Sequence, residues 1–69
     1  MDRTGVVSST VVSIGYDAES STLEIEFHNG TVYQYFDISE TTHVELITAG
    51  SVGAYLNSHI KGKYRFSKV

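Results

Sequence analysis

The sequence contains no cysteine, no proline and no tryptophan. Without cysteine the chain can form neither a disulfide scaffold nor a thiolate zinc site, and it has no cysteine nucleophile. Apolar residues occur in runs of two or three at most, whereas a membrane helix needs about 20 in succession. The N-terminus also lacks the apolar stretch of a signal peptide. We therefore expect a cytoplasmic protein that does not cross a membrane.

The composition that remains is that of a folded domain. Of the 69 residues, 41% are hydrophobic and 19% are charged, whereas disordered chains combine low hydrophobicity with high charge. This length allows one domain at most. We therefore expect a single domain over residues 1–69, with an ordered core over residues 6–66.

Three strands are predicted in the N-terminal half. Residues 6–16 are rich in valine and other β-branched side chains, which fit a pleated strand. Residues 23–28 alternate apolar and polar side chains, which is the period of a half-buried strand. Asn29-Gly30 follows, and this pair is the strongest short signal for a two-residue hairpin turn. The third strand is predicted over residues 31–36.

A two-residue turn at Asn29-Gly30 would fix which residues share a face of the hairpin. The core face would then carry the side chains of Leu23, Ile25, Phe27, Val32 and Phe36. Tyr33 and Tyr35 would lie on the opposite face, together with Glu24 and Glu26. We therefore expect both tyrosine rings to point away from the packed interior.

Two helices are predicted in the C-terminal half. The first lies within residues 39–49, where Ser39 or Thr41 can cap it and Gly50 suits a left-handed stop. The second begins at Ser51 and has apolar positions at helical spacing, namely Val52, Tyr55, Leu56, His59 and Ile60. Such a stripe is typical of a helix that covers a core.

The residues after the second helix alternate aromatic and basic side chains. Residues 63–69 are expected to form either a fourth short strand or an extended arm on the sheet. Gly53, inside the second helix, indicates a close crossing against the sheet or the other helix. The predicted fold class is α+β, with a three-stranded antiparallel β-meander followed by two short helices in the order β-β-β-α-α.

Several motifs in this chain have a distinctive order and spacing. They are Ile14-Gly15-Tyr16-Asp17, Tyr33-Gln34-Tyr35 and Ala49-x-Ser51-x-Gly53-x-Tyr55-x-Asn57-x-x-Ile60. In this respect residues 3–66 resemble the KTSC domain, a small domain of bacterial and phage proteins that also occurs at the C-terminus of some lysyl-tRNA synthetases. The resemblance implies no established activity. Because the domain is attached to enzymes that act on tRNA, the resemblance suggests RNA binding.

Two groups of residues are candidates for contacting a nucleic acid. Tyr33 and Tyr35 could stack on bases if their face is open, which is worth about 1–3 kcal/mol per base. The alternative, which we favour, is that the tail or the first strand covers both rings. The last nine residues hold four of the five cations and no acid. We therefore select Lys61, Lys63, Arg65 and Lys68 as candidates for binding an anion, together with Tyr64, although a solvated tail would show the same composition.

Two further residues are weaker candidates for a ligand site. Ser51 lies at a predicted helix N-terminus, where free N–H groups could hold an anion, and the simpler interpretation is an ordinary N-cap. Asn57 lies within the second helix, where it could hydrogen-bond a ligand or, more simply, a loop backbone.

The sequence favours a binding module without catalytic residues. Its three histidines, His28, His43 and His59, have no i, i+4 spacing, so we expect no metal site and no cofactor. Hydroxyl, imidazole and carboxylate groups are present, but no motif aligns them into a nucleophilic triad. The expected partner is RNA or single-stranded nucleic acid. The alternative is a protein-interaction module, including a homodimer, that binds no nucleic acid.

Overall fold

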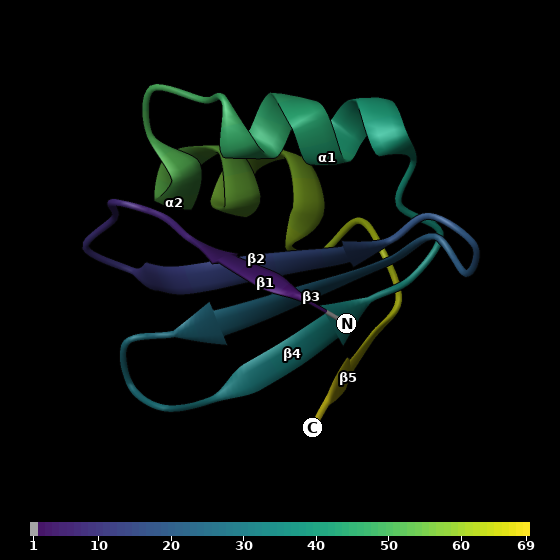
Figure 1. The fold of residues 1–69 in the computed structure, drawn as a ribbon, viewed down its shortest axis with the longest axis horizontal. Helices are drawn as coiled ribbons and strands as arrows, with labels where there is room; N and C mark the ends of the chain where they lie inside the picture. Colours follow the sequence, from purple (N-terminus) through teal and green to yellow (C-terminus); the bar gives the residue numbers. More distant parts are fainter. Residues whose placement is uncertain (1) are drawn as a thin grey trace.

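The structure, a computed structural model, describes residues 2–69 as one antiparallel sheet with helices on one of its faces (Figure 1). The strands follow one another across the sheet in sequence order and are β1 (Arg3–Gly5), β2 (Val11–Asp17), β3 (Thr22–Phe27), β4 (Val32–Tyr35) and β5 (Phe66–Lys68). The helical segments between β4 and β5 are α1 (Glu40–Ile47), α2 (Val52–Tyr55) and a π-helical turn, η1 (Leu56–Ile60). The predicted α+β class is confirmed.

The sheet has two strands beyond the predicted three-stranded meander. β1 pairs with β2 in a region where the sequence predicts only an irregular start. β5 pairs with β4, which confirms the fourth short strand that was one of two options for the tail. The first predicted strand also begins too early, because residues 6–10 form a loop in which the Ser8 hydroxyl accepts hydrogen bonds from two backbone N–H groups.

The hairpin between β3 and β4 contradicts the predicted two-residue turn. The Phe27 N–H donates to the Thr31 carbonyl over 2.9 Å, so three residues, 28–30, form the loop. Gly30 has a φ of 89°, whereas Asn29 is not among the residues with positive φ. A type I′ turn requires positive φ at both central positions. The loop instead has the geometry of a three-residue hairpin that ends in a left-handed glycine.

This longer loop shifts the register by one residue and exchanges the two faces of β4. Leu23 pairs with Tyr35, and Ile25 pairs with Tyr33. Both tyrosines therefore lie on the helix side of the sheet, and the prediction that they face away from the core is wrong. Tyr35 is only 3% exposed and belongs to the core. Tyr33 is partly buried and packs against that core.

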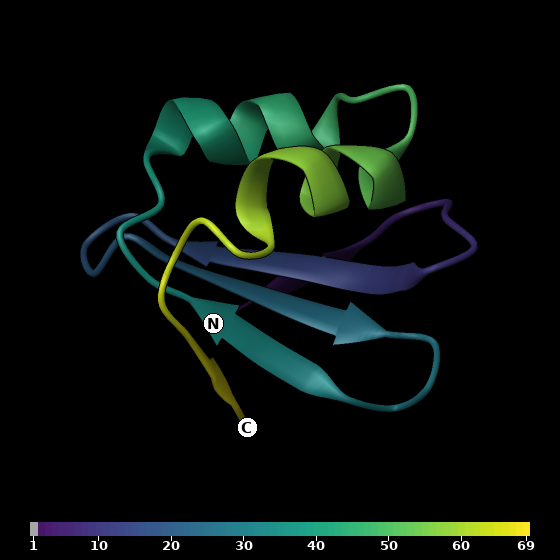
Figure 2. The same ribbon diagram turned by 180° about the vertical axis from the view of Figure 1, so that it is seen from behind.

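The core fills the space between the sheet and the helices, which lie side by side above it (Figures 1 and 2). Its buried apolar residues are Val11, Ile14, Leu23, Ile25, Phe27, Tyr35, Ile38, Leu46, Val52, Leu56 and Ile60. Three of the residues predicted for the second helix, Val52, Leu56 and Ile60, are in this set. The α2–η1 segment therefore contributes one continuous apolar stripe to the core.

Side-chain caps define the starts of both helices. Ser39 accepts a hydrogen bond from the Thr42 N–H at 3.2 Å, and Ser51 accepts one from the Ala54 N–H at 3.2 Å. Each cap satisfies one of the N–H groups that a helix start leaves without a partner. The predicted left-handed stop at Gly50 is wrong, because α1 ends at Ile47 and Gly50 does not have a positive φ.

The face of the sheet opposite the helices carries an ion-pair network. Arg3 lies 3.4 Å from a Glu24 carboxylate oxygen and 3.6 Å from a Glu26 carboxylate oxygen. Gln34 donates to Glu24 at 2.9 Å, and Ser13 donates to Glu26 at 3.0 Å. These two acids are thus paired on one face of the sheet, while Tyr33 and Tyr35 lie on the other.

A stacked pair of rings joins α1 to the sheet and makes stability depend on pH. The ring centroids of His43 and Tyr16 lie 4.5 Å apart, and the Tyr16 hydroxyl donates to the Ile38 carbonyl at 2.6 Å. Burial lowers the pKa of His43, although nearby Glu40 opposes this shift. A lowered pKa means that the folded state favours neutral imidazole, so its contribution to stability is full above the unfolded pKa of about 6.5.

We expect His43→Phe to flatten part of the pH dependence of folding. In the native chain the free energy of unfolding should decrease as pH falls from about 6.5 through the lowered pKa of His43, because protonation disfavours the folded state. The phenylalanine keeps a ring against Tyr16 but does not titrate. Urea unfolding of both proteins at several pH values measures this difference. An identical pH profile for the two would contradict the prediction.

Candidate functional site

A hollow of about 300 Å³ opens on the helix side of the sheet, between the end of η1 and strands β4 and β5. We call it the aromatic hollow, and its lining residues are Tyr33, Tyr35, Lys61, Gly62 and Phe66. β4 supplies the two tyrosines because the three-residue loop turns their face toward the helices. β5 supplies Phe66, which pairs with Tyr35 across the sheet. The site thus depends on the register of both hairpin strands and on the last strand.

Three aromatic residues line this hollow. The Phe66 centroid lies 5.7 Å from that of Tyr33 and 5.9 Å from that of Tyr35. The Tyr33 and Phe66 rings are almost perpendicular, at 86°, which is a favourable edge-to-face arrangement. Phe66 remains 61% exposed. Part of its ring is therefore free to receive another planar group.

The basic segment, residues 61–69, brings positive charge to the hollow. The Lys61 ammonium lies 5.1 Å from the centroid of the Phe27 ring, which is a cation–π distance. Lys68 pairs with Tyr33 in the sheet register and therefore shares the helix side of the sheet. Within residues 2–69, no ion pair involves Lys61, Lys63 or Lys68. These three charges are available to an anion.

Backbone contacts hold this segment against the sheet edge. Gly62 has a φ of 78°, which lets the chain turn after η1. The Phe36 N–H donates to the Arg65 carbonyl at 3.0 Å, and the Val69 N–H donates to the Val32 carbonyl at 2.9 Å. The tail is therefore an ordered strand beside β4, descending from the helices along the edge of the sheet (Figure 2).

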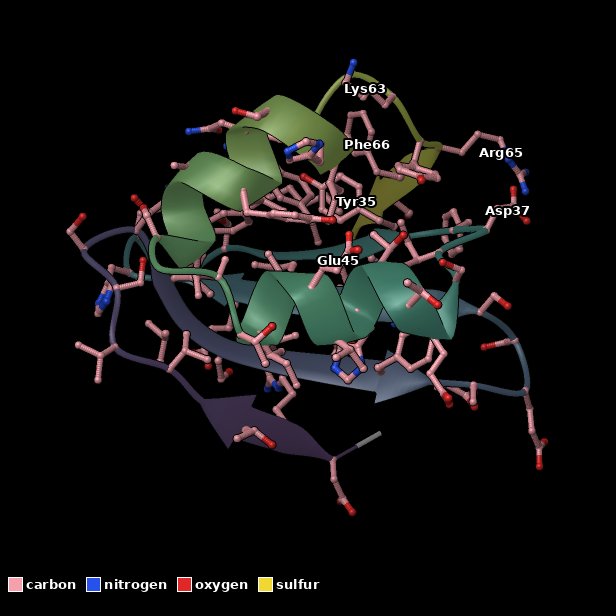
Figure 3. All side chains as sticks on the ribbon, turned by 90° about the horizontal axis from the view of Figure 1, so that it is seen from above. Tyr35, Asp37, Glu45, Lys63, Arg65 and Phe66 are labelled. Carbon is pink, nitrogen blue, oxygen red and sulfur yellow. The ribbon has the colours of Figure 1, made fainter. Side chains whose placement is uncertain are left out.

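A second, broader recess lies along the same segment. It is open to solvent and is lined by Phe36, Gly62, Lys63, Tyr64, Arg65 and Phe66. Arg65 lies 5.8 Å from the Phe36 ring centroid and 3.1 Å from an Asp37 carboxylate oxygen. Figure 3 shows Arg65 reaching toward Asp37, whereas Lys63 projects away from the sheet. Because both members of the Arg65–Asp37 pair are well exposed, this contact is weak.

The structure brings together most of the candidate residues from the sequence. Tyr33, Tyr35 and Lys61 line the hollow, and Lys63, Tyr64 and Arg65 line the neighbouring recess. Ser51 serves as the N-cap of α2, a helix of only four residues, and lines neither cavity. Asn57 is exposed on η1 and also lines neither cavity.

Sequence reasoning missed two aromatic residues of this surface. Phe66 lines both cavities, and Phe36 lies beneath Arg65 in the recess. The alternation of Tyr64 and Phe66 with basic residues was the available signal for Phe66. Phe36 was predicted for the core face, and only the corrected register places it on the other side of β4.

The described part of the chain contains neither a metal-binding cluster nor a membrane-spanning helix. Among residues 2–69, no three histidine, aspartate or glutamate side chains gather in a way that could hold a metal ion. No helix in that range is long and apolar enough to cross a bilayer.

Comparisons with known proteins identify relatives along nearly the whole chain. A family model described as the KTSC domain matches residues 7–64. A lysine–tRNA ligase of Nostoc punctiforme is 36% identical over 61 residues, which is 88% of this chain but 11% of the ligase. The chain thus spans about a tenth of that enzyme's length. An uncharacterized protein of Stutzerimonas stutzeri is 34% identical and is covered over 99% of its length.

A solved structure shows the same fold. The crystal structure of a KTSC domain protein from Yersinia pestis superposes with a TM-score of 0.94 at 39% sequence identity. The match covers 99% of this chain and 96% of the other. A match over both full lengths means that the fold described above is shared as a unit.

Proposed function

The chain belongs to the KTSC domain family, and we propose a binding role for it, because membership of this family implies no established activity. We infer that this domain is a non-enzymatic module that holds single-stranded nucleic acid, RNA in particular. The strand would follow the basic segment, with its phosphates near Lys61, Lys63 and Lys68. Its bases would meet the aromatic residues of the hollow and the recess.

The observation that carries this proposal is the juxtaposition of free cations with aromatic rings along one segment. Lys61, Lys63 and Lys68 make no ion pair within residues 2–69, and the aromatic hollow lies directly beside them. Proteins that bind single strands combine these two features, because phosphates require cations and every base has a face that can stack.

The net charge of −3 does not oppose this proposal, because the charges are separated in space. Glu24 and Glu26 are paired with Arg3 on the face of the sheet opposite the hollow. Within residues 2–69, Asp37 is the acid that forms an ion pair with the basic segment. A local positive surface can attract an anion even when the whole chain is acidic.

The match to lysine–tRNA ligases also supports an RNA partner. By their names these enzymes act on tRNA, and a stretch equivalent to most of this chain is part of them. This support comes by association, whereas the arrangement of charge and rings belongs to this chain itself.

The alternative is a protein-interaction module, and the structure removes two of the features on which the sequence-based hypothesis depended. The third predicted strand, β4, is not an edge strand, because β5 pairs with it. Tyr35 is buried rather than part of an exposed tyrosine face. The edge strands β1 and β5 have three residues each, which leaves little backbone for a partner strand to pair with.

We expect the chain to bind a short fluorescent RNA with strong salt dependence, measured by anisotropy. With three lysines on phosphates the logarithmic salt slope should be about −2.1, so affinity should fall roughly 20-fold between 50 and 200 mM salt. Lys63→Ala/Lys68→Ala should reduce the magnitude of this slope by about 1.4.

A matched control changes the net charge equally but away from the basic segment. Ala18 and Thr41 are both exposed, the first in the β2–β3 turn and the second on α1. Ala18→Glu/Thr41→Glu should keep most of the native affinity and salt slope. If the two double variants lose affinity equally, or if the native chain does not bind at low salt, the proposed function is wrong. Concentration-dependent light scattering without RNA binding would favour the protein-interaction alternative.

A further inference from the structure

One residue that lines the aromatic hollow, Tyr35, has a hydroxyl without a hydrogen-bond partner within residues 2–69. Only 3% of the Tyr35 surface is accessible to solvent. The Tyr16 hydroxyl donates to a backbone carbonyl and the Tyr55 hydroxyl donates to Glu45. Within residues 2–69, no hydrogen bond engages the hydroxyl of Tyr35. This hydroxyl is therefore free to bond water or a ligand.

The hydroxyl of Tyr35 is not fully buried. No fully buried side-chain oxygen or nitrogen in the described chain lacks a partner. The Tyr35 oxygen must therefore keep some contact with solvent, and the aromatic hollow is the cavity that Tyr35 lines. Burial, together with neighbouring Tyr33, raises the pKa of Tyr35 above 10.0. At neutral pH the hydroxyl consequently carries its proton and can both donate and accept.

The remaining walls suit a planar ligand with an attached anion. Phe66 is exposed at the mouth, and Figure 3 shows it beside Tyr35 next to the basic segment. Lys61 is the one charged residue that lines the hollow. A volume of about 300 Å³ lies at the small end of ligand pockets, so one heterocycle fits but not a stack of several.

We propose that the aromatic hollow receives a single nucleotide of the bound strand. Its base stacks on Phe66, one polar atom of its edge pairs with the Tyr35 hydroxyl, and its phosphate lies near Lys61. This inference rests on the proposed function and deepens it. The basic segment holds the strand irrespective of sequence, and the hollow makes binding depend on the base.

Titration with the four ribonucleoside monophosphates tests the hollow separately from strand binding. Amide chemical shifts are followed by NMR, with ribose phosphate as the probe that has the charge but no base. We expect shifts centred on Tyr35, Lys61 and Phe66, larger for nucleotides than for ribose phosphate, and unequal among the four bases. Equal shifts with ribose phosphate and with every nucleotide would overturn the inference, because they would show an anion site alone.

Two variants test the assigned contacts. Phe66→Ala should weaken nucleotide binding about 5- to 150-fold, the range expected for a lost stack. Tyr35→Phe retains the buried ring and should weaken the preferred nucleotide about 2- to 12-fold, as expected for one hydrogen bond, while reducing the differences among bases. Val69→Ala serves as the control, because Val69 is exposed after β5 but does not line the hollow.

The outcomes separate this inference from the proposed function. If RNA binds with the expected salt slope but Phe66→Ala and Tyr35→Phe leave affinity and base preference unchanged, the one-nucleotide hollow is wrong and the proposed function stands. If RNA does not bind while a mononucleotide still shifts the three residues, the proposed function is wrong and the hollow remains a nucleotide site.

Discussion

Replacing Tyr35 with alanine is expected to lower the free energy of unfolding by about 3–5 kcal/mol. Tyr35 is 3% exposed and belongs to the core, where its ring lies against Phe66 and Tyr33. Removal of so large a buried ring leaves a cavity that the surroundings fill only in part. Since a chain of 69 residues has a total stability on the order of 3–10 kcal/mol, this variant should be close to unfolding.

The adjacent residue provides the control for this experiment. Phe36 has a ring of similar size but is only half-buried and lies on the solvent side near Arg65. Phe36→Ala should therefore cost only about 1 kcal/mol. Urea unfolding followed by circular dichroism gives both values, and Tyr35→Leu supplies a measurable substitute if Tyr35→Ala does not fold. A larger loss at position 36 than at position 35 would mean that the two-residue turn is correct after all.

Gly53→Val is expected to destabilise the fold by about 1–3 kcal/mol through overpacking. Gly53 is buried in α2, and a Cβ placed on it would lie 3.2 Å from the Thr10 hydroxyl oxygen and 3.7 Å from the Ser8 hydroxyl oxygen. Position 53 therefore lies close to the loop of residues 6–10. The predicted close approach exists, but the prediction that it is made to the sheet or to the other helix is wrong. A branched side chain there would require the Thr10 side chain to move.

The loop opposite Gly53 is held firmly, which makes relief by local movement difficult. The Thr10 carbonyl accepts from the His28 N–H at 3.1 Å, and Nε2 of His28 lies 2.8 Å from the Ser8 carbonyl. The control is Ala54→Val, one residue along on the exposed side of α2, which should cost only a few tenths of a kcal/mol as a change in helix propensity. Thermal unfolding of both variants decides the matter. Equal melting temperatures would contradict the close packing at position 53.

Sequence patterns predicted the elements of this fold better than their contacts. The alternation of residues 23–28 identified β3, and the stripe from Val52 to Ile60 identified the second helix, because each pattern reports directly on one buried side of one element. β1 and β5 span three residues each, which is too short for any period to be distinctive. Their existence depends on pairing with strands that are already in place.

The register of the hairpin could not be read from Asn29-Gly30 alone. The pair fits a two-residue loop, but it also fits the last two positions of a three-residue loop, where only the glycine needs positive φ. Both registers bury Leu23, Ile25 and Phe27, so the apolar pattern of β3 does not choose between them. The choice lies in β4, which has an apolar or aromatic residue on each face, Val32 on one and Tyr33 and Tyr35 on the other. Tyr33 and Tyr35 were selected as candidates from the sequence, but their location required coordinates.

The aromatic hollow exists only while β5 is paired with β4. One wall of the hollow is Phe66, and its strand pairs with β4 only after the intervening chain has wound through both helices. Closing so long a segment costs chain entropy, and we expect a three-residue edge strand to be among the first parts of the domain to open. We therefore expect the hollow to form late and to open early, and a ligand bound in it to stabilise the terminal strand against fraying.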